Sequence, residues 1–204
     1  FPKEGVMKTN AYVAGVGMTR FGKFLDRGLK DIGSEAVKMA IADASIAVKE
    51  IEGAWVGNAA AGLVTGQESI RGQVVLRSAG IGKIPVINVE NACASAATAF
   101  NQAALMVSAG LYDVALAVGV EKLYHEDKAK SFGAFTGAVD VEAMEEIMAE
   151  LKRSAEQGGA AKAGEGAGKK RSMFMDIYAA GARKHMELYG TTAEQFAGVS
   201  AKNS

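Results

Sequence analysis

The sequence is poor in cysteine, histidine and proline: its 204 residues include one cysteine, two histidines and two prolines. A single cysteine cannot form an internal disulfide, and one cysteine with two histidines supplies too few ligands for a closed structural zinc site. We therefore expect a reducing, cytoplasmic location and no bound metal. The chain also has no apolar run near the roughly 18 residues of a membrane-spanning helix and no secretory leader pattern, so we expect no membrane association.

An excess of charge of one sign is also missing. The 23 Lys and Arg side chains balance 23 Asp and Glu side chains, for a formal net charge of +0. Nucleic acids and anionic membranes attract basic surfaces, so neither is expected as a partner. The sequence is instead rich in hydrophobic residues, at 49%, and in glycine, with 25 residues. This composition is typical of a globular protein with many tight turns.

Hydrophobic periodicity predicts alternating strands and helices. Four short runs have small or β-branched residues on both faces, as buried parallel strands do. These runs are Ala11–Val16, Ala54–Val56, Pro85–Val89 and Val114–Val120. Helical spacing between the runs predicts helices over about 31–48, 68–79 and 94–110, the first of them capped by Asp31. The alternation predicts an α/β domain with a mixed, mostly parallel sheet covered by helices.

The character of the sequence changes after Glu121. Segment 155–168 contains five glycines and few large apolar residues, so it cannot bury enough surface to offset the entropy of ordering and is expected to be flexible. Further helices are predicted over 142–157, 173–189 and 193–200. Thr191 or Thr192 is expected to cap the last helix.

Cys93 has an unusual setting. It follows the predicted strand Pro85–Val89 and opens a helix whose first residues are tiny. Free backbone N–H groups and the positive end of the helix dipole meet at such a position, where they favour a thiolate and can stabilise an oxyanion. Acyl transfer to sulfur needs both effects. A small cysteine packed in a tight turn would explain the same residues, so the residues alone leave both interpretations open.

Other candidate sites are weaker. Gly15 and Gly17 follow a predicted strand as in a dinucleotide-binding fingerprint, but the third glycine is missing. His125 stands beside two acidic residues and is a candidate general base. His185 lies toward the end of a predicted helix, where a cation suits the dipole. We interpret both histidines as structural.

Three stretches carry a family resemblance: AGVGMTRFGK at 14–23, VENACASA at 89–96 and VGVEK at 118–122. They resemble the N-terminal half of the thiolase superfamily, in particular its sterol-carrier-protein-type, or lipid-transfer-protein-like, branch. Helical residues between Met175 and Thr192 are also similar to the helices that precede the second half of that family. The resemblance covers nearly the whole chain from Met7, which we expect to be the native start.

The resemblance implies a fold and a nucleophile. Residues 7–123 would form the N-terminal βαβαβα half, and residues 124–204 would form the loop domain inserted in it, with the C-terminal half absent. The family's acyl-accepting cysteine lies in the turn that Cys93 occupies here. The chain contains no Gly-His-Pro motif and no second cysteine. We therefore expect a truncated chain, a fragment or half of a split enzyme.

The resemblance also implies an activity: a thiolase-like acyl-CoA acyltransferase that cleaves or forms a carbon–carbon bond through an acyl group on Cys93. Acyl-CoA would be the substrate, no cofactor would be tightly bound, and Pro85–Val89 would pair across the two-fold axis of a homodimer. One alternative is a retro-aldolase on CoA thioesters of sterol side chains or aromatic acids, with a small zinc-ribbon, OB-fold (DUF35-like) partner. Another is a non-catalytic lipid or acyl-CoA binder in which Cys93 only packs.

Overall fold

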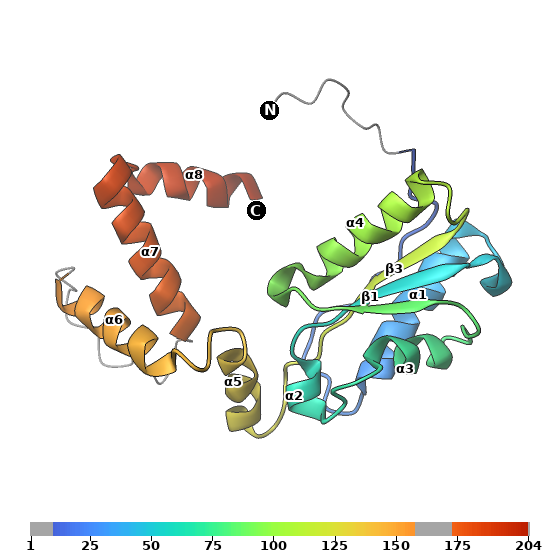
Figure 1. The fold of residues 1–204 in the computed structure, drawn as a ribbon, viewed down its shortest axis with the longest axis horizontal. Helices are drawn as coiled ribbons and strands as arrows, with labels where there is room; N and C mark the ends of the chain where they lie inside the picture. Colours follow the sequence, from blue (N-terminus) through green and yellow to red (C-terminus); the bar gives the residue numbers. More distant parts are fainter. Residues whose placement is uncertain (1–9, 158–172, 204) are drawn as a thin grey trace. The chain divides into compact units, whose positions relative to one another are not determined.

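The computed structural model describes residues 10–157 and 173–203, which fall into two compact units that follow one another at Ala138 and Val139 (Figure 1). In chain order the first unit contains α1 (Leu29–Ala44), the short 3-10 helix η1 (Val48–Glu50), β1 (Gly53–Gly57), α2 (Ala61–Thr65), α3 (Arg71–Ser78), β2 (Val86–Val89), the 3-10 turn η2 (Ala92–Ala94), α4 (Ser95–Ser108), β3 (Ala115–Gly119) and α5 (Lys128–Thr136). The second unit contains α6 (Met144–Gln157), α7 (Met173–Tyr189) and α8 (Ala193–Asn203). The domain boundary expected between 123 and 124 stays a prediction.

A three-stranded parallel sheet in the order β2-β1-β3 forms the centre of the first unit. The last residue of β1, Gly57, lies opposite Val89 of β2 and Gly119 of β3. All of β1 is buried, as a central parallel strand requires. β2 is less buried than expected, with Ile87 37% exposed, because it stands at the edge of the sheet. Three of the four expected strands are thus confirmed.

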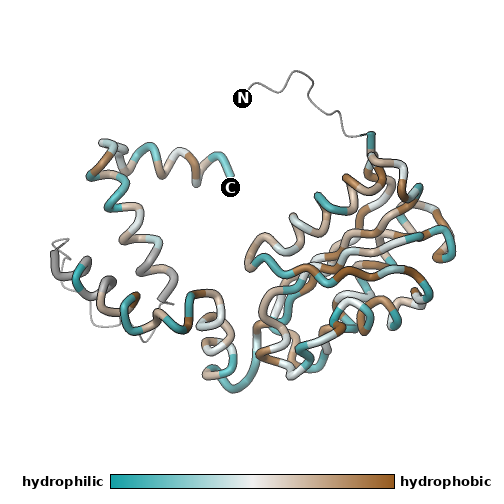
Figure 2. The backbone as a smooth tube through the Cα atoms, viewed as in Figure 1, coloured by the Kyte–Doolittle hydropathy of each residue, from teal (hydrophilic) through white to brown (hydrophobic). Residues whose placement is uncertain are grey.

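Helices cover both faces of this sheet (Figure 1). On one face Val56 and Val118 pack in a core with Leu76 of α3 and residues of α1. On the other face Trp55 packs with Ala99 of α4 and meets Tyr112 edge-on, with ring centroids 5.8 Å apart. Figure 2 shows hydrophobic residues concentrated along the strands between these helices. The α/β class and the helix-covered parallel sheet are therefore confirmed.

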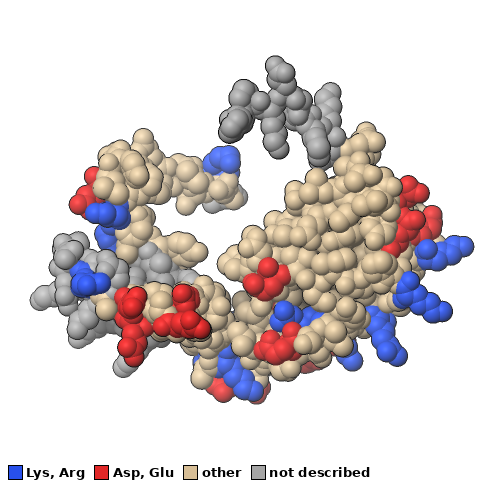
Figure 3. All heavy atoms as spheres, in the orientation of Figure 1, with Lys and Arg blue, Asp and Glu red and all other residues tan. Residues whose placement is uncertain are grey.

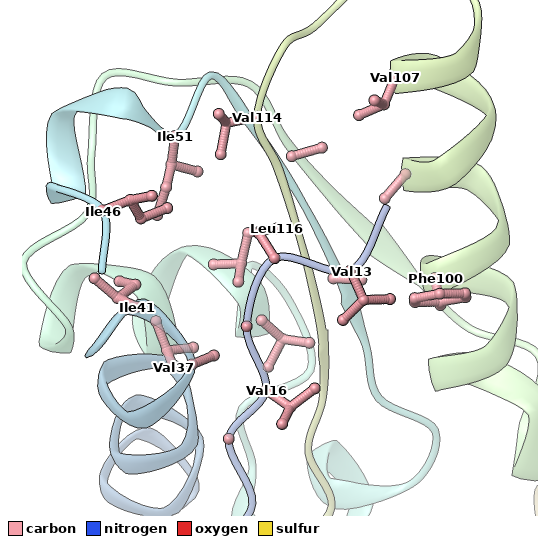
Figure 4. Close-up of a pocket in the computed structure, with 18 of the residues that line it drawn as sticks. Val13, Val16, Val37, Ile41, Ile46, Ile51, Phe100, Val107, Val114 and Leu116 are labelled. Atoms are coloured by element: carbon pink, nitrogen blue, oxygen red, sulfur yellow. The ribbon is translucent and has the colours of Figure 1, made fainter. Parts of the chain in front are cut away.

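The strand expected at Ala11–Val16 is wrong. The segment belongs to no ladder in the described structure, where β3 pairs with β1 alone and its other edge is left without a strand. It lies instead on α1, where a Cβ on Gly17 would come within 2.2 Å of the Ala36 carbonyl oxygen. With α1, α4 and β3 the segment lines an apolar groove of about 570 Å³, which has Val13 and Phe100 on its walls (Figure 4).

Helix boundaries differ from the expected ones for local reasons. α1 ends at Ala44 because Ser45 adopts a left-handed φ of 55°. Asp31 is not its N-cap residue but its third residue, and its Oδ2 accepts a hydrogen bond from the Gly28 N–H at 2.9 Å. α3 begins later than expected because Ile70, directly before it, also adopts a left-handed φ, of 53°.

The second unit is helical, and α6 packs against α7 within it. The expected cap at Thr192 is confirmed: its N–H donates to Gln195 Oε1 at 2.8 Å, and the Gln195 N–H donates to Thr192 Oγ1 at 3.3 Å. This is a capping box at the start of α8. Residues 155–157 of the segment expected to be flexible belong to α6, and the rest of it lies outside the described residues. None of the described helices is both long and apolar enough to cross a membrane.

Candidate active site

The turn that carries Cys93 lies at the carboxyl ends of the parallel strands. Two glycines let the turn approach the sheet closely. A Cβ on Gly57, at the end of β1, would lie 2.6 Å from the Ser95 carbonyl carbon, and one on Gly119, at the end of β3, would lie 2.5 Å from Ala96 Cβ. Neither position accommodates a side chain. Open parallel sheets bind ligands at this edge, so the sheet places Cys93 where a substrate is expected.

Hydrogen bonds hold the turn in a fixed shape. The Asn91 N–H donates to Ser95 Oγ at 2.9 Å, and the Ser95 hydroxyl donates to the Ala92 carbonyl oxygen at 2.7 Å. Asn91 Nδ2 also donates to Thr98 Oγ1 at 2.9 Å. Ala92, directly before Cys93, adopts a left-handed φ of 44°. This conformation costs a non-glycine residue about 1–2 kcal/mol, and such local strain is concentrated at functional sites.

Cys93 is exposed, unlike the packed cysteine that the residues alone left open. Ala92, Ala94, Ala96 and Ala97 around it are also exposed, so small side chains leave room beside the sulfur. Within the described chain, α4 has no side-chain hydrogen bond at its N-cap and no acidic residue in its first turn. The positive end of its dipole therefore lies beside the sulfur, although the Ser95 N–H donates to the Ala92 carbonyl oxygen and Glu90 Oε1 accepts from the Ala92 N–H at 2.6 Å.

Two further side chains, Asn58 and Glu121, meet near this turn, and the sequence alone does not identify them as candidates. The Asn58 N–H donates to the Val89 carbonyl oxygen at 3.1 Å, and Asn58 Nδ2 donates to the Val120 carbonyl oxygen at 2.6 Å and to Glu121 Oε1 at 3.2 Å. Asn58 is 3% exposed, and its Oδ1 finds no partner among the described residues. An unpaired buried acceptor costs about 1–3 kcal/mol. Glu121 belongs to a stretch that carried the family resemblance, but no sequence spacing links it to Cys93.

The two histidines have local contacts. His125 Nδ1 accepts a hydrogen bond from the Asp127 N–H at 2.9 Å, and the His125 N–H donates to Ser131 Oγ at 3.1 Å. His185 lies against Tyr189 and Phe196, with ring centroids 4.7 and 5.9 Å away. These contacts agree with structural roles.

Charge and metal ligands are sparse around the site. On the face shown in Figure 3 the surface over α4 is almost free of charged side chains, and the sequence of α4 contains none. In the part of the chain that the structure describes, no three His, Cys, Asp or Glu side chains are grouped to hold a metal ion. The chemical features at this edge of the sheet are thus a thiol, backbone N–H groups, the Asn58–Glu121 pair and the Glu90 carboxylate, whose Oε1 accepts a hydrogen bond from the Ala92 N–H at 2.6 Å.

A helix-covered parallel sheet defines the class of this protein as an α/β fold, and the exposed Cys93 in a strained turn at the carboxyl edge of the sheet is its candidate site. The family model described as "Thiolase, N-terminal domain" matches residues 11–203. The chain belongs to this family, which confirms the resemblance to the N-terminal half of thiolases.

Curated relatives support this assignment. The chain is 34% identical to "Acetyl-CoA acetyltransferase" of Methanothermobacter thermautotrophicus, in an alignment that covers 94% of this chain and 43% of the relative. It is 32% identical to "Sterol carrier protein 2" of Gallus gallus, over 97% of this chain and 33% of the relative. The chain therefore spans less than half the length of these relatives.

Solved structures are more distant. The structure titled "Ltp2-ChsH2(DUF35) aldolase" is 22% identical, with a TM-score of 0.42, and the match covers 76% of this chain and 40% of that one. A 3-oxoacyl-[acyl-carrier-protein] synthase III from Aquifex aeolicus is 15% identical, also with a TM-score of 0.42, over 52% of this chain and 35% of that one.

Proposed function

We propose that this chain supplies the nucleophile of a thiolase-like acyl-CoA acyltransferase and that Cys93 is that nucleophile. The observation that carries the proposal is the exposed thiol of Cys93 in a rigid turn before an uncapped helix, inside a thiolase N-terminal domain. The domain match supports the reaction class, and the turn supports the choice of residue.

The Cys93 sulfur attacks the thioester or ketone carbonyl carbon of an acyl-CoA. A sulfur–carbon bond forms while the carbon–sulfur bond to CoA breaks and the CoA thiolate leaves. If the ketone of a 3-oxoacyl-CoA is attacked, its carbon–carbon bond breaks instead and its CoA-bearing fragment leaves as a carbanion; either leaving group takes up a proton. The oxyanion that develops is stabilised by the backbone N–H of Cys93 and by donors outside this chain. Attack on the acyl-cysteine by a CoA thiol or a carbon nucleophile then releases the product. The general acid and base belong, in this proposal, to the C-terminal half of the family fold.

Two measurements on the complete protein test this proposal. Incubation with an acyl-CoA is expected to leave an acyl group on Cys93, visible by mass spectrometry of the peptide that contains it. Iodoacetamide is expected to alkylate Cys93 rapidly near neutral pH, and acyl-CoA is expected to protect it. Free coenzyme A without the acyl group serves as the control, because it occupies the site without acylating the sulfur.

Substitution separates the proposed mechanism from its alternatives. Cys93→Ala is expected to abolish thiolytic turnover, and Cys93→Ser is not expected to restore it, because an alkoxide is far less accessible than a thiolate near pH 7. Undiminished thiolysis by Cys93→Ala would contradict covalent catalysis. Carbon–carbon cleavage that does not need the thiol would instead favour a retro-aldolase with a DUF35-like partner, and acyl-CoA binding without turnover would favour a lipid binder.

We also propose that the protein is a cytoplasmic homodimer that pairs through β2. In the described part of the chain β2 pairs only with β1, so its other edge is open to a strand from a second copy. Light scattering is expected to give the mass of a dimer. Ile87→Lys, which adds a charge to this edge, is expected to weaken dimerisation, and the exposed control Met39→Lys on α1 is not. A monomeric parent protein would contradict the pairing.

A further inference from the structure

Two carboxylates bridge the same pair of strands at opposite ends. Glu52 precedes β1, and its Oε2 accepts hydrogen bonds from the N–H groups of Asp113 at 2.5 Å and Val114 at 3.3 Å, which lead into β3. Glu121 follows β3, and its Oε2 accepts hydrogen bonds from the Ala59 N–H at 2.9 Å and the Ala60 N–H at 3.0 Å, which follow β1. The chemistry is the same at both ends, but only Glu121 lies at the end that carries Cys93.

A short path of rigid contacts links Glu121 to the cysteine turn. Glu121 Oε1 accepts a hydrogen bond from Asn58 Nδ2 at 3.2 Å, and Asn58 directly follows Gly57. Gly57 in turn packs on the backbone of Ser95 so closely that a Cβ would lie 2.6 Å from the Ser95 carbonyl oxygen. Because the last contact joins backbone to backbone, a shift at the end of β1 moves the first turn of α4 and Cys93 with it.

The unpaired Oδ1 of Asn58 is a second, independent observation. Asn58 is buried, yet this acceptor has no partner in the described chain. Unsatisfied groups of this kind call for an explanation in a native structure. Glu121, by contrast, is exposed, so its hydrogen bonds add little to global stability. Both facts favour a role in geometry.

We propose that Glu121 and Asn58 are positioning residues for Cys93. They fix the carboxyl end of β1 beneath the nucleophile turn, so that the sulfur stays aligned with the N–H groups at the start of α4. This inference rests on the proposed function of Cys93, because it assigns the pair to the use of that thiol. Neither residue touches the reacting atoms.

Glu121→Gln tests the inference, with Glu52→Gln as its matched control. The amide keeps the size of the side chain, but its NH2 group must face either the two backbone N–H donors or Asn58 Nδ2, so one set of hydrogen bonds is lost. In the complete protein, alkylation of Cys93 by iodoacetamide is expected to slow about tenfold in Glu121→Gln and to stay within about twofold of the parent rate in Glu52→Gln. The expected kinetic signature is a lower kcat for acyl transfer with KM nearly unchanged.

Asn58→Ser is the second variant, in case Glu121→Gln folds poorly. It removes the amide while the Glu121 contacts to Ala59 and Ala60 remain, and it is expected to slow alkylation in the same direction by about threefold. Equal alkylation rates in Glu121→Gln and Glu52→Gln, or an unchanged rate in Asn58→Ser, would overturn the positioning role. The proposed function fails separately, if Cys93→Ala retains turnover, and the alkylation rates would still decide whether the pair orders the turn.

Discussion

Two helix starts in this chain are held in opposite ways. The start of α8 is capped by neighbouring residues: Thr192 and Gln195 exchange hydrogen bonds, and Glu194 lies in the first turn. α4 has Ala94 at its N-cap and, in the described structure, no side-chain hydrogen bond there. Its first turn is held by local hydrogen bonds of Ser95 and also by a distant part of the chain, because it packs on the glycine that ends β1.

The difference shows how a helix start becomes available for chemistry. A capping box uses up the free N–H groups and stabilises the helix locally. The start of α4 has no side-chain cap; the N–H groups of Ala94 and Ser95 donate to carbonyl oxygens of the preceding turn, and the thiol of Cys93 in that turn stays exposed. Each start is therefore expected to weaken when the contacts that hold it are removed.

The largest effect is expected for Gly57→Ala, with Gly53→Ala at the other end of β1 as its control. The new Cβ of Gly57→Ala would meet backbone atoms of Ser95 at 2.6 Å, which cannot rotate away. Overpacking of this kind costs about 1–3 kcal/mol. The new Cβ of Gly53→Ala would lie 3.3 Å from the rings of Trp55 and Tyr112, a contact that small ring movements relieve. Urea unfolding followed by Trp55 fluorescence checks this, and equal midpoints would show that the α4 contact is not tight.

Ser95→Ala is expected to cause the next largest loss of stability, with Ser108→Ala at the end of α4 as its control. Ser95 is buried, and its loss leaves the Asn91 N–H without its acceptor, which costs about 1–2 kcal/mol. Ser108 only donates to the Ala104 carbonyl oxygen within the helix, so its replacement is expected to be nearly neutral. Thermal unfolding measures both. A larger loss in Ser108→Ala would mean that the turn is held by other contacts.

Thr192→Ala is expected to have a smaller and more local effect. The capping box at α8 loses its hydroxyl acceptor, so the free energy of local opening should fall by about 1 kcal/mol. Hydrogen exchange at the Gln195 amide measures this opening. Thr191→Ala is the control, since Thr191 is not the residue that caps the helix. Exchange that stays at the parent rate in Thr192→Ala would contradict local closure of α8.

The smallest effect is expected from pH at Glu194. A backbone hydrogen bond at Glu194 and a side-chain hydrogen bond with Thr192 lower the pKa of this carboxyl below its ordinary value of 4.5. A lowered pKa in the folded state stabilises α8 above pH 4.5, and this contribution is lost as the pH falls through the folded-state pKa. Amide exchange in α8, corrected for its intrinsic pH dependence, should therefore speed up in acid. Glu194→Gln should remove this response; a response that persists would point to another group.

Local signals made most of the fold predictable. The apolar runs at Ala54–Val56 and Val114–Val120 form strands because their residues suit burial on both faces, and Thr192 caps its helix through contacts within four residues. Cys93 was singled out by its position between a strand and a helix of tiny residues, which the structure reproduces.

Features that depend on distant pairing were not predictable. Ala11–Val16 has the composition of a central strand, but joining the sheet needs hydrogen bonds to a strand far along the chain. In the described structure the segment packs on α1 and lies beside β3 without joining a ladder. The contact between Asn58 and Glu121 joins residues 63 positions apart, so no local sequence pattern predicts it. Gly57 and Gly119 look like ordinary strand ends in the sequence, and only the packing of α4 explains why they lack side chains.

The walls of the groove beside β3 come from parts of the chain that are synthesised at different times. Residues 11–17 leave the ribosome before the rest of the described chain, yet the other walls of their groove come from α1, α4 and β3, which ends at Gly119. The groove does not exist until those residues have also been synthesised. The walls of the groove therefore come together only late in synthesis, and Tyr12, Val13 and Val16 remain 90%, 63% and 67% exposed even after they have done so.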